Sequence, residues 1–312
     1  MVVTGRLAGK VVVVTGAGRG VGRDYALEFA RHGASVVVND LGGSASGDGA
    51  DAGPAQAVVD EIRAMGGTAS SNADDVADEA GAQSLIRTAL DGFGRLDVLV
   101  NNAGILRDRT VANMSFDEWD SVVRVHLRGT FGPTHFALRH WRDLSKAGEK
   151  VDGRIINTTS SSGLYCNPGQ ANYGAAKAGV AALTVITSRE AARYGVKVNA
   201  VYPTAASRLT AGVLEKMGKG TPAEGEFDPL DPSNIAPVVV WLAGPQAESI
   251  TGRVFGVRGG RLTVAEGWSA GPIAEVDRRW TVEELDDVVP DLVEAAAENA
   301  GTNGRVPEKT TS

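Results

Sequence analysis

Two side chains that could exchange a proton with a substrate, Tyr173 and Lys177, lie four residues apart in the segment YGAAK. On a helix this spacing puts both side chains on one face, one turn apart. A tyrosine with its usual pKa of about 10 is a poor base at neutral pH, but a neighbouring ammonium group lowers that pKa by favouring the phenolate. The pair therefore predicts a general acid/base for a carbinol or carbonyl. The spacing also occurs by chance; its place after the fifth predicted strand, which ends at Ser160, makes it specific.

A cluster of glycines, Thr15–Gly22 (TGAGRGVG), follows the apolar run Val11–Thr15 and precedes a segment of helical character. Glycines permit positive φ and let the backbone approach a pyrophosphate, while the free N–H groups at the start of a helix supply positive potential. A glycine-rich turn is weak evidence by itself in a chain with 40 glycines. With a strand before it and a helix after it, the cluster predicts dinucleotide binding.

Asp40 ends the second predicted strand, and its acidic side chain bears on the choice of dinucleotide. A carboxylate at this place can accept hydrogen bonds from both hydroxyls of the adenosine ribose, and it would repel a 2′-phosphate. The following segment, Leu41–Gly53, contains no basic residue that could compensate. We therefore expect NAD rather than NADP. Further polar residues, in Asp75-Val76 and Asn101–Gly104 (NNAG), end the third and fourth predicted strands, and such ends face the ligand crevice of a doubly wound sheet.

The composition excludes several other classes of function. With 31 basic and 38 acidic residues, the chain has a net charge of −7, which disfavours a nucleic-acid binder that works by bulk charge. The only cysteine is Cys166, so no intramolecular disulfide is possible, and we expect a small buried packing residue there. The four histidines form no HExxH motif, so no metal site is predicted. Without an N-terminal signal sequence or a run of about 18 apolar residues, we expect a cytoplasmic protein with no membrane span.

The elements that must position these residues follow from an alternation of short apolar runs with longer segments of helical period. The runs are Val11–Thr15, Val36–Asn39, Leu96–Asn101, Arg154–Thr158 and Lys197–Val201. Such alternation predicts an α/β fold, a doubly wound parallel sheet with helices on both faces.

Three segments depart from the alternation. Leu41–Gly53 is a flexible glycine-rich loop, and residues 204–234 resemble a mobile lid over a substrate. Residues 268–312 form a C-terminal extension, in which Thr281 and Glu284 could form a capping box that opens a helix. We expect Pro290 to interrupt or kink that helix, and residues 300–312 to be disordered.

Four ordered motifs together resemble the short-chain dehydrogenase/reductase family: TGxxxGxG at Thr15–Gly22, NNAG at Asn101–Gly104, a serine 13 residues before the tyrosine, and YxxxK at Tyr173–Lys177. The resemblance implies a single Rossmann-type domain, residues 1–267, with a seven-stranded parallel sheet. It implies that Tyr173 is the acid/base, that Lys177 binds the nicotinamide ribose, and that Ser160 binds the reacting oxygen. It also implies that the cofactor contacts Gly16, Gly18, Arg19, Gly20, Val21, Gly22, Asp40, Asp75, Val76, Asn102, Ala103, Gly104, Tyr173, Lys177 and Pro203.

One departure from the family pattern is His126, which stands where the family often has an asparagine that completes a proton relay. A packing role is one interpretation of this histidine. The other is a place in the relay, since imidazole both donates and accepts hydrogen bonds.

Other segments narrow the resemblance, among them Asn39–Gly43 (NDLGG) and Gly163–Lys177 (GLYCNPGQANYGAAK). They look like the dehydrogenase domain of peroxisomal multifunctional enzymes of type 2, and like stand-alone bacterial relatives of sterol side-chain degradation. This likeness implies oxidation of a lipid-type secondary alcohol, either a 3-hydroxyacyl-CoA, with a steroid side chain as one option, or a 17β-hydroxysteroid, by a homodimer or homotetramer. An NADPH-dependent 3-oxoacyl reductase and a non-catalytic nucleotide-binding protein stay open as alternatives.

Overall fold

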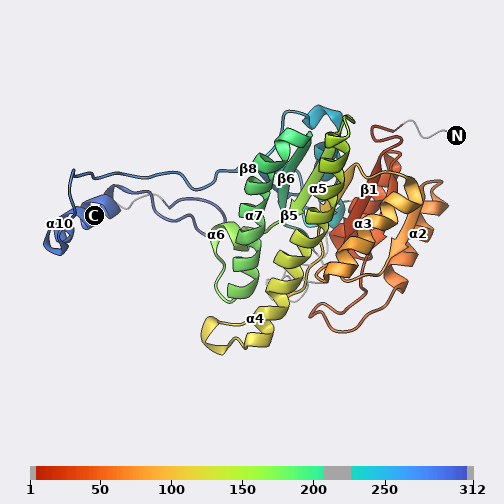
Figure 1. Ribbon diagram of the computed structural model, residues 1–312. Helices are drawn as coiled ribbons and strands as arrows, with labels where there is room; N and C mark the ends of the chain where they lie inside the picture. The colour runs from red at the N-terminus through yellow and green to blue at the C-terminus, as the bar shows by residue number, and fades with distance from the viewer. Residues whose placement is uncertain (1–4, 207–225, 308–312) are drawn as a thin grey trace.

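The computed structural model describes residues 5–206 and 226–307, in which one twisted sheet is covered by helices on both faces (Figure 1). The strand order is β3-β2-β1-β4-β5-β6-β7-β8, and the first seven strands are parallel. The order reverses between β1 and β4, which is where an open α/β sheet forms its ligand crevice. The strands are β1 Val11–Thr15, β2 Ser35–Asn39, β3 Thr68–Asn72, β4 Val98–Asn101, β5 Gly153–Thr158, β6 Val196–Pro203, β7 Val254–Arg258 and β8 Arg261–Ala265.

The predicted doubly wound α/β fold is confirmed, but the prediction of seven strands is wrong by one. The eighth strand, β8, pairs antiparallel with β7. The two strands are joined by Gly259 and Gly260, and Gly259 has φ +52°. A two-residue glycine turn between apolar runs is a hairpin signal, so the sequence contains a local indication of β8.

Strand β1 shows why the sheet is covered on both sides. Val12 and Val14 pack into one apolar cluster, and Val11 and Val13 into the other, because successive side chains of a strand point to opposite faces. The first cluster includes side chains of α1, α2 and α9, and the second includes side chains of α3, α5 and α7. Figure 1 shows α3, α5 and α7 lying over the second face. These helices are α1 Gly20–Arg31, α2 Gly53–Ala64, α3 Glu79–Phe93, α5 Gly129–Lys146, α7 Ala171–Ala191 and α9 Ala236–Ala243.

Short elements complete the region around the carboxyl ends of the strands. Helix α4 (Phe116–Val123) runs through a π-helical segment, Arg124–Arg128, into α5, and α6 (Ser161–Tyr165) follows β5. The remaining single turns are Val111–Asn113, Ala192–Tyr194, Pro232–Ile235 and Pro245–Ala247. Most of the predicted lid falls on residues 207–225, which lie outside the described residues.

The C-terminal extension leaves the body of the protein as an arm that carries α10 (Val282–Ala295), as Figure 1 shows. Thr281 and Glu284 form the predicted capping box. Of the two effects predicted for Pro290, an interruption is wrong, since α10 continues through it, and a kink stays a prediction. Proline has no N–H, so Pro290 cannot donate a hydrogen bond to the carbonyl oxygen four residues earlier in α10. No residue of α10 is buried, so water can reach that carbonyl oxygen instead. Beyond α10 the chain forms a hydrogen-bonded turn at 301–305 where disorder was predicted; residues 308–312 lie outside the described part of the chain.

Candidate functional site

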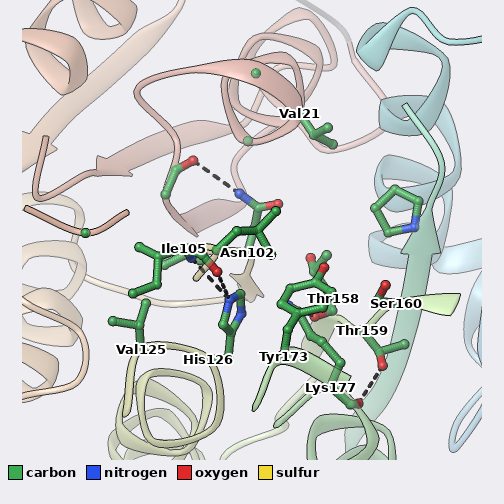
Figure 2. Close-up of a pocket in the computed structure, with 18 of the residues that line it drawn as sticks. Val21, Asn102, Ile105, Val125, His126, Thr158, Thr159, Ser160, Tyr173 and Lys177 are labelled. Carbon is green, nitrogen blue, oxygen red and sulfur yellow. Dashed lines mark hydrogen bonds between the residues drawn. The ribbon is translucent and has the colours of Figure 1, made fainter. Parts of the chain in front are cut away.

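A cavity of about 640 Å³ lies at the carboxyl ends of the strands and brings the predicted site residues together (Figure 2). It is lined by the predicted catalytic residues Ser160, Tyr173, Lys177 and His126. It is also lined by predicted cofactor residues from five segments of the chain: Gly16, Arg19, Gly20, Val21, Gly22, Asp40, Asp75, Val76, Asn102, Ala103, Gly104 and Pro203. Of the predicted residues only Gly18 does not line it.

The glycine-rich turn at the start of α1 has the geometry of an anion cradle. Gly16 and Gly20 have φ of +62° and +54°, a region that side-chain-bearing residues rarely adopt. A Cβ at Gly22 would lie 2.2 Å from the carbonyl oxygen of Gly16, so only glycine fits there. The N-cap residue of α1, Arg19, has no side-chain cap, and the first turn holds no acidic residue. Within the described part of the chain, no acidic side chain caps the N–H groups at this helix terminus, which fits a pyrophosphate.

Gly18 does not line the cavity, but it holds the Asp40 carboxylate, which does. The Asp40 Oδ2 atom accepts a hydrogen bond from the Gly18 N–H at 2.8 Å, and Oδ1 accepts one from the Gly42 N–H at 2.7 Å. A Cβ at Gly18 would lie 2.8 Å from Oδ2, so a side chain there would displace the carboxylate. Each carboxylate oxygen keeps lone pairs for further donors, such as ribose hydroxyls.

The end of β4 is fastened to the glycine-rich turn. The Asn102 side-chain amide donates to the carbonyl oxygens of Thr15 and Gly16, each at 3.1 Å, and Figure 2 shows Asn102 beside that turn. The Thr15 hydroxyl oxygen accepts from the backbone N–H groups of Asn102 and Ala103. These four bonds set the shape of the crevice between β1 and β4. Asn102 therefore shapes the cavity indirectly, by holding the glycine-rich turn in place.

Lys177 is 3% exposed and donates a hydrogen bond from Nζ to the Thr158 carbonyl oxygen at 2.5 Å. Its Nζ atom lies 5.8 Å from the centre of the Tyr173 ring, so the two side chains share the face of α7 as expected. Thr159 fixes the same turn of α7, since its hydroxyl donates to the Lys177 carbonyl oxygen at 2.6 Å (Figure 2). Burial lowers the pKa of Lys177 to about 7.

Ser160 and its two neighbours, Ser161 and Ser162, all line the cavity, but their hydrogen bonds differ. Ser160 is the N-cap of α6, and its Oγ accepts the Ser162 N–H at 3.1 Å. A hydrogen bond with Ser160 also acts on the Tyr173 hydroxyl and lowers its pKa. The Ser162 hydroxyl instead donates to Gln170 Oε1 at 2.7 Å. The serine chosen from its spacing is therefore the one coupled to the tyrosine.

The pKa of Tyr173 differs from the expectation. Burial raises this pKa above its ordinary value, the Ser160 hydrogen bond lowers it in part, and the negative charge of Asp108 raises it. The predicted lowering by Lys177 is wrong for this structure, because burial removes much of the charge that the ammonium would carry at neutral pH. Tyr173 is thus a protonated phenol at neutral pH, able to donate a proton to a carbonyl oxygen.

His126 is buried in the π-helical segment, and its ring stands edge-on to the Tyr173 ring at 5.0 Å. Its Nε2 atom lies 3.1 Å from the Ile105 nitrogen and 2.8 Å from the Ile105 oxygen (Figure 2). Its Nδ1 atom is buried without a hydrogen-bond partner among the described residues. Burial, and then the charge of Lys177, hold the pKa of His126 well below its usual range. The ring is therefore neutral and positions the Ile105 segment, and a place in a proton relay stays a prediction.

Several residues of the cavity were not predicted from the sequence. They are Asn39, Leu41, Gly43, Ser44, Gly47, Asp74, Ile105, Leu106, Asp108, Arg124, Val125, Thr158, Thr159, Ser161, Ser162, Asn167, Gln170, Thr204, Ala205, Leu230 and Arg258. Many lie next to a predicted residue, so extending each motif by a few positions would have found them. Thr204, Ala205 and Leu230 lie in the predicted lid, residues 204–234, whereas Arg258 is distant from every motif and carried no such signal. The expectation of a buried Cys166 is wrong, since this residue is exposed, with φ +54°.

The described part of the chain contains neither a candidate metal cluster nor a candidate membrane-spanning helix. Among the residues with a described placement, no three His, Cys, Asp or Glu side chains are grouped so that they could hold a metal ion. Within residues 5–206 and 226–307, no helix has the length and apolar character needed to cross a membrane.

Comparison with known proteins agrees with this geometry. The family model of short chain dehydrogenases matches residues 10–216. Hydroxyacyl-CoA dehydrogenase ChsB1 of Mycobacterium tuberculosis is 46% identical over 265 residues, which cover 83% of this chain and 80% of that protein. Peroxisomal multifunctional enzyme type 2 of Drosophila melanogaster is 42% identical over 97% of this chain, which spans 50% of that larger protein.

A solved structure shares the fold closely. The crystal structure of a short chain dehydrogenase from Mycobacterium avium superposes with a TM-score of 0.85 at 49% identity, over 95% of this chain and 99% of that one. The family model covers more than half of the sequence, and the structural match extends over nearly all of it. The chain therefore belongs to the short-chain dehydrogenase/reductase family of oxidoreductases, which bind a nicotinamide nucleotide.

Proposed function

We propose that the chain is an NAD-dependent dehydrogenase that oxidises the 3-hydroxyl group of a 3-hydroxyacyl-CoA to the ketone. One observation carries the proposal: Tyr173, Ser160 and Lys177 line the same cavity as the uncapped terminus of α1 and the Asp40 carboxylate. A proton-transfer group and a dinucleotide cradle in one cavity are what an alcohol dehydrogenase requires.

When bound, NAD⁺ supplies an acceptor for the hydride that leaves the carbinol carbon. The residues that would hold it are the N–H groups at the start of α1 for the pyrophosphate, Asp40 for the adenosine ribose, and Lys177 for the nicotinamide ribose. Asp40 favours NAD because its charge would oppose a 2′-phosphate.

Tyr173 does the acid/base work of this mechanism. Only the minor phenolate form of Tyr173, which grows as pH rises, can take the hydroxyl proton of the substrate while the C–H bond breaks, so that the two electrons of that bond leave as hydride and a carbonyl remains. Ser160 holds the reacting oxygen by a hydrogen bond, and its coupling to Tyr173 supports this placement. In the reverse direction the Tyr173 phenol returns the proton to the carbonyl oxygen.

The substrate class rests on the relatives. The Mycobacterium tuberculosis relative is named a hydroxyacyl-CoA dehydrogenase, and it aligns with most of this chain. The site itself requires only a secondary alcohol that reaches the Tyr173 hydroxyl, so a 17β-hydroxysteroid is an alternative of the same reaction type.

A second candidate function is an NADPH-dependent 3-oxoacyl reductase. One observation favours it: Arg19, a cation at the start of α1, lines the cavity as Asp40 does. A guanidinium group at this place could pair with a 2′-phosphate.

Initial rates of the purified protein would decide between these proposals. We expect NADH to form from a 3-hydroxyacyl-CoA with NAD⁺, with a kcat/KM for NAD⁺ at least about tenfold above that for NADP⁺. A preference for NADP⁺ would favour the reductase. Turnover with a 17β-hydroxysteroid but not with the acyl-CoA would show that the steroid, and not the acyl-CoA, is the substrate. Lack of turnover with every substrate and both cofactors would contradict the proposed function.

A further inference from the structure

The loop of residues 41–53, called here the glycine loop, borders the cavity next to Asp40. Its residues Leu41, Gly43, Ser44 and Gly47 line the cavity. Five of its thirteen residues are glycine, and Gly42, Gly47 and Gly49 have positive φ. A chain segment so rich in glycine loses much conformational entropy when it is ordered. Hydrogen bonds within the loop, such as the one from the Asp51 N–H to the Leu41 carbonyl oxygen at 2.9 Å, offset part of that cost. Contacts from outside the loop offset more of it.

Arg107 makes the contacts that hold the glycine loop from outside. Its Nε donates to the Ser46 carbonyl oxygen at 2.9 Å, and its Nη2 lies 3.3 Å from Asp48 Oδ1. Its Nη1 donates to Asp117 Oδ2 at 2.6 Å, at the start of α4. The Arg107 side chain is only 20% exposed, although both aspartates are largely exposed. Three donors of one guanidinium group thus tie the loop to α4.

The segment that carries Arg107 adds two contacts of its own. The Leu106 N–H donates to the Ala45 carbonyl oxygen at 3.1 Å. A Cβ at Gly47 would lie 2.9 Å from Ile105 Cδ1, so the loop backbone rests directly on the Ile105 side chain. The glycine loop is thereby fixed at its middle, far from its ends at β2 and α2.

The backbone of Arg107 is fixed in turn to the helix that carries Tyr173. Asn172 is fully buried, and its side-chain amide donates to the Arg107 carbonyl oxygen at 2.9 Å and to the Glu118 carbonyl oxygen at 3.0 Å. The Asn172 Oδ1 atom accepts the Tyr173 N–H at 2.7 Å. A continuous set of hydrogen bonds therefore joins the glycine loop to the start of α7. Arg107 itself is not among the described residues that line the cavity.

We propose that Arg107 is a positioning residue for the dinucleotide, which clamps the glycine loop over the adenosine end of the cavity. This inference rests on the proposed function, since it takes the cavity to bind NAD. By ordering the loop in advance, the clamp removes an entropy cost that binding would otherwise have to meet. Lysine cannot replace arginine here, because one ammonium group cannot serve a carbonyl and two carboxylates in three directions.

Arg107→Met tests the clamp, with Arg107→Lys as a variant that keeps the charge and most of the stem. The control is Arg142→Met, because Arg142 pairs with its neighbour Asp143 on α5, outside this cavity. The first measurement is the equilibrium dissociation constant for NADH. The second is hydrogen–deuterium exchange of the glycine loop without any nucleotide. The third is the division of the kinetic effect between KM for NAD⁺ and kcat.

We expect Arg107→Met to weaken NADH binding about tenfold and to speed exchange in residues 41–53 and 105–109 about tenfold, while exchange in α2 is unchanged. KM for NAD⁺ should rise, whereas kcat should stay within about twofold of the wild-type value. Arg107→Lys should stay within about threefold of Arg107→Met in NADH affinity. Arg142→Met should match the wild type in all three measurements.

Three results would overturn the clamp. They are unchanged NADH affinity in Arg107→Met, unchanged exchange of the glycine loop, or wild-type affinity in Arg107→Lys. If the wild-type protein binds neither NADH nor NADPH, the proposed function fails as well. If the wild type binds NADH and the Arg107 variants bind it equally well, only the clamp is refuted.

Discussion

Replacing Lys177 by methionine should stabilise the protein at neutral pH. Burial lowers the pKa of Lys177 from 10.5 to about 7, which means that the folded state disfavours the charged form. The difference between these pKa values corresponds to about 4 kcal/mol of destabilisation at pH 7. Methionine removes this penalty but leaves the Thr158 carbonyl oxygen without its donor, which costs about 2 kcal/mol. The net gain expected for Lys177→Met at pH 7 is about 2 kcal/mol.

The pH dependence gives this prediction its sign. Between pH 7 and about 10.5 the unfolded chain holds a proton on Lys177 that the folded protein does not, so this group makes the wild type more stable as pH rises. The advantage of Lys177→Met should therefore vanish by about pH 9.5.

Equilibrium unfolding in urea at both pH values measures the effect. Lys146→Met, at an exposed lysine, is the control and should change little. The reasoning is refuted if Lys177→Met is less stable than the wild type at pH 7, or if the gap is the same at both pH values.

Three further predictions follow from the site and the arm. Because burial holds the pKa of Tyr173 above its ordinary value of about 10, the phenolate fraction grows about tenfold per pH unit, so the rate of alcohol oxidation should increase at least about a hundredfold between pH 7 and pH 9.5 in initial-rate assays; a flat profile would count against Tyr173 as the base. Asp40→Asn should reduce the ratio of kcat/KM for NAD⁺ to that for NADP⁺ about tenfold, and an unchanged ratio would show that Asp40 does not set the preference. Removing residues 268–312 should change the melting temperature by less than about 2 °C in a thermal scan, since α10 buries no residue, whereas a fall above about 5 °C would show that the arm supports the fold.

Much of the fold was predictable because its signals are local. The β-branched run Val11–Thr15 indicates a strand buried on both faces, and it packs into both apolar clusters. The order of the motifs along the chain was enough to bring Tyr173 and Asp40 to one cavity, since the carboxyl ends of parallel strands meet at one edge of the sheet. The hairpin of β7 and β8 was also predictable, because the pair Gly259-Gly260 between two apolar runs is a turn signal, but the prediction of seven strands did not include it.

The electrostatics of the site were less predictable, because a pKa depends on burial in three dimensions. The four-residue spacing of Tyr173 and Lys177 predicts proximity, which is correct, but it does not show that Lys177 is 3% exposed. Burial of Tyr173 itself raises its pKa, opposite to the expected direction. Burial of Lys177 lowers the pKa of the lysine to about 7, which weakens the ammonium charge that was expected to oppose this shift. The contacts of Arg107 were hidden for a related reason, because its partners lie about 60 residues earlier in the chain and in α4.

The central claim, hydride transfer from a carbinol carbon with Tyr173 as the base, is tested most directly with a 3-hydroxyacyl-CoA that carries deuterium at carbon 3. The account predicts that the deuterium appears in the reduced nicotinamide of NAD, with turnover in the wild type and at least about a hundredfold slower turnover in Tyr173→Phe. Deuterium retained in the acyl-CoA product or lost to water would contradict it. Full turnover by Tyr173→Phe would contradict the role of Tyr173.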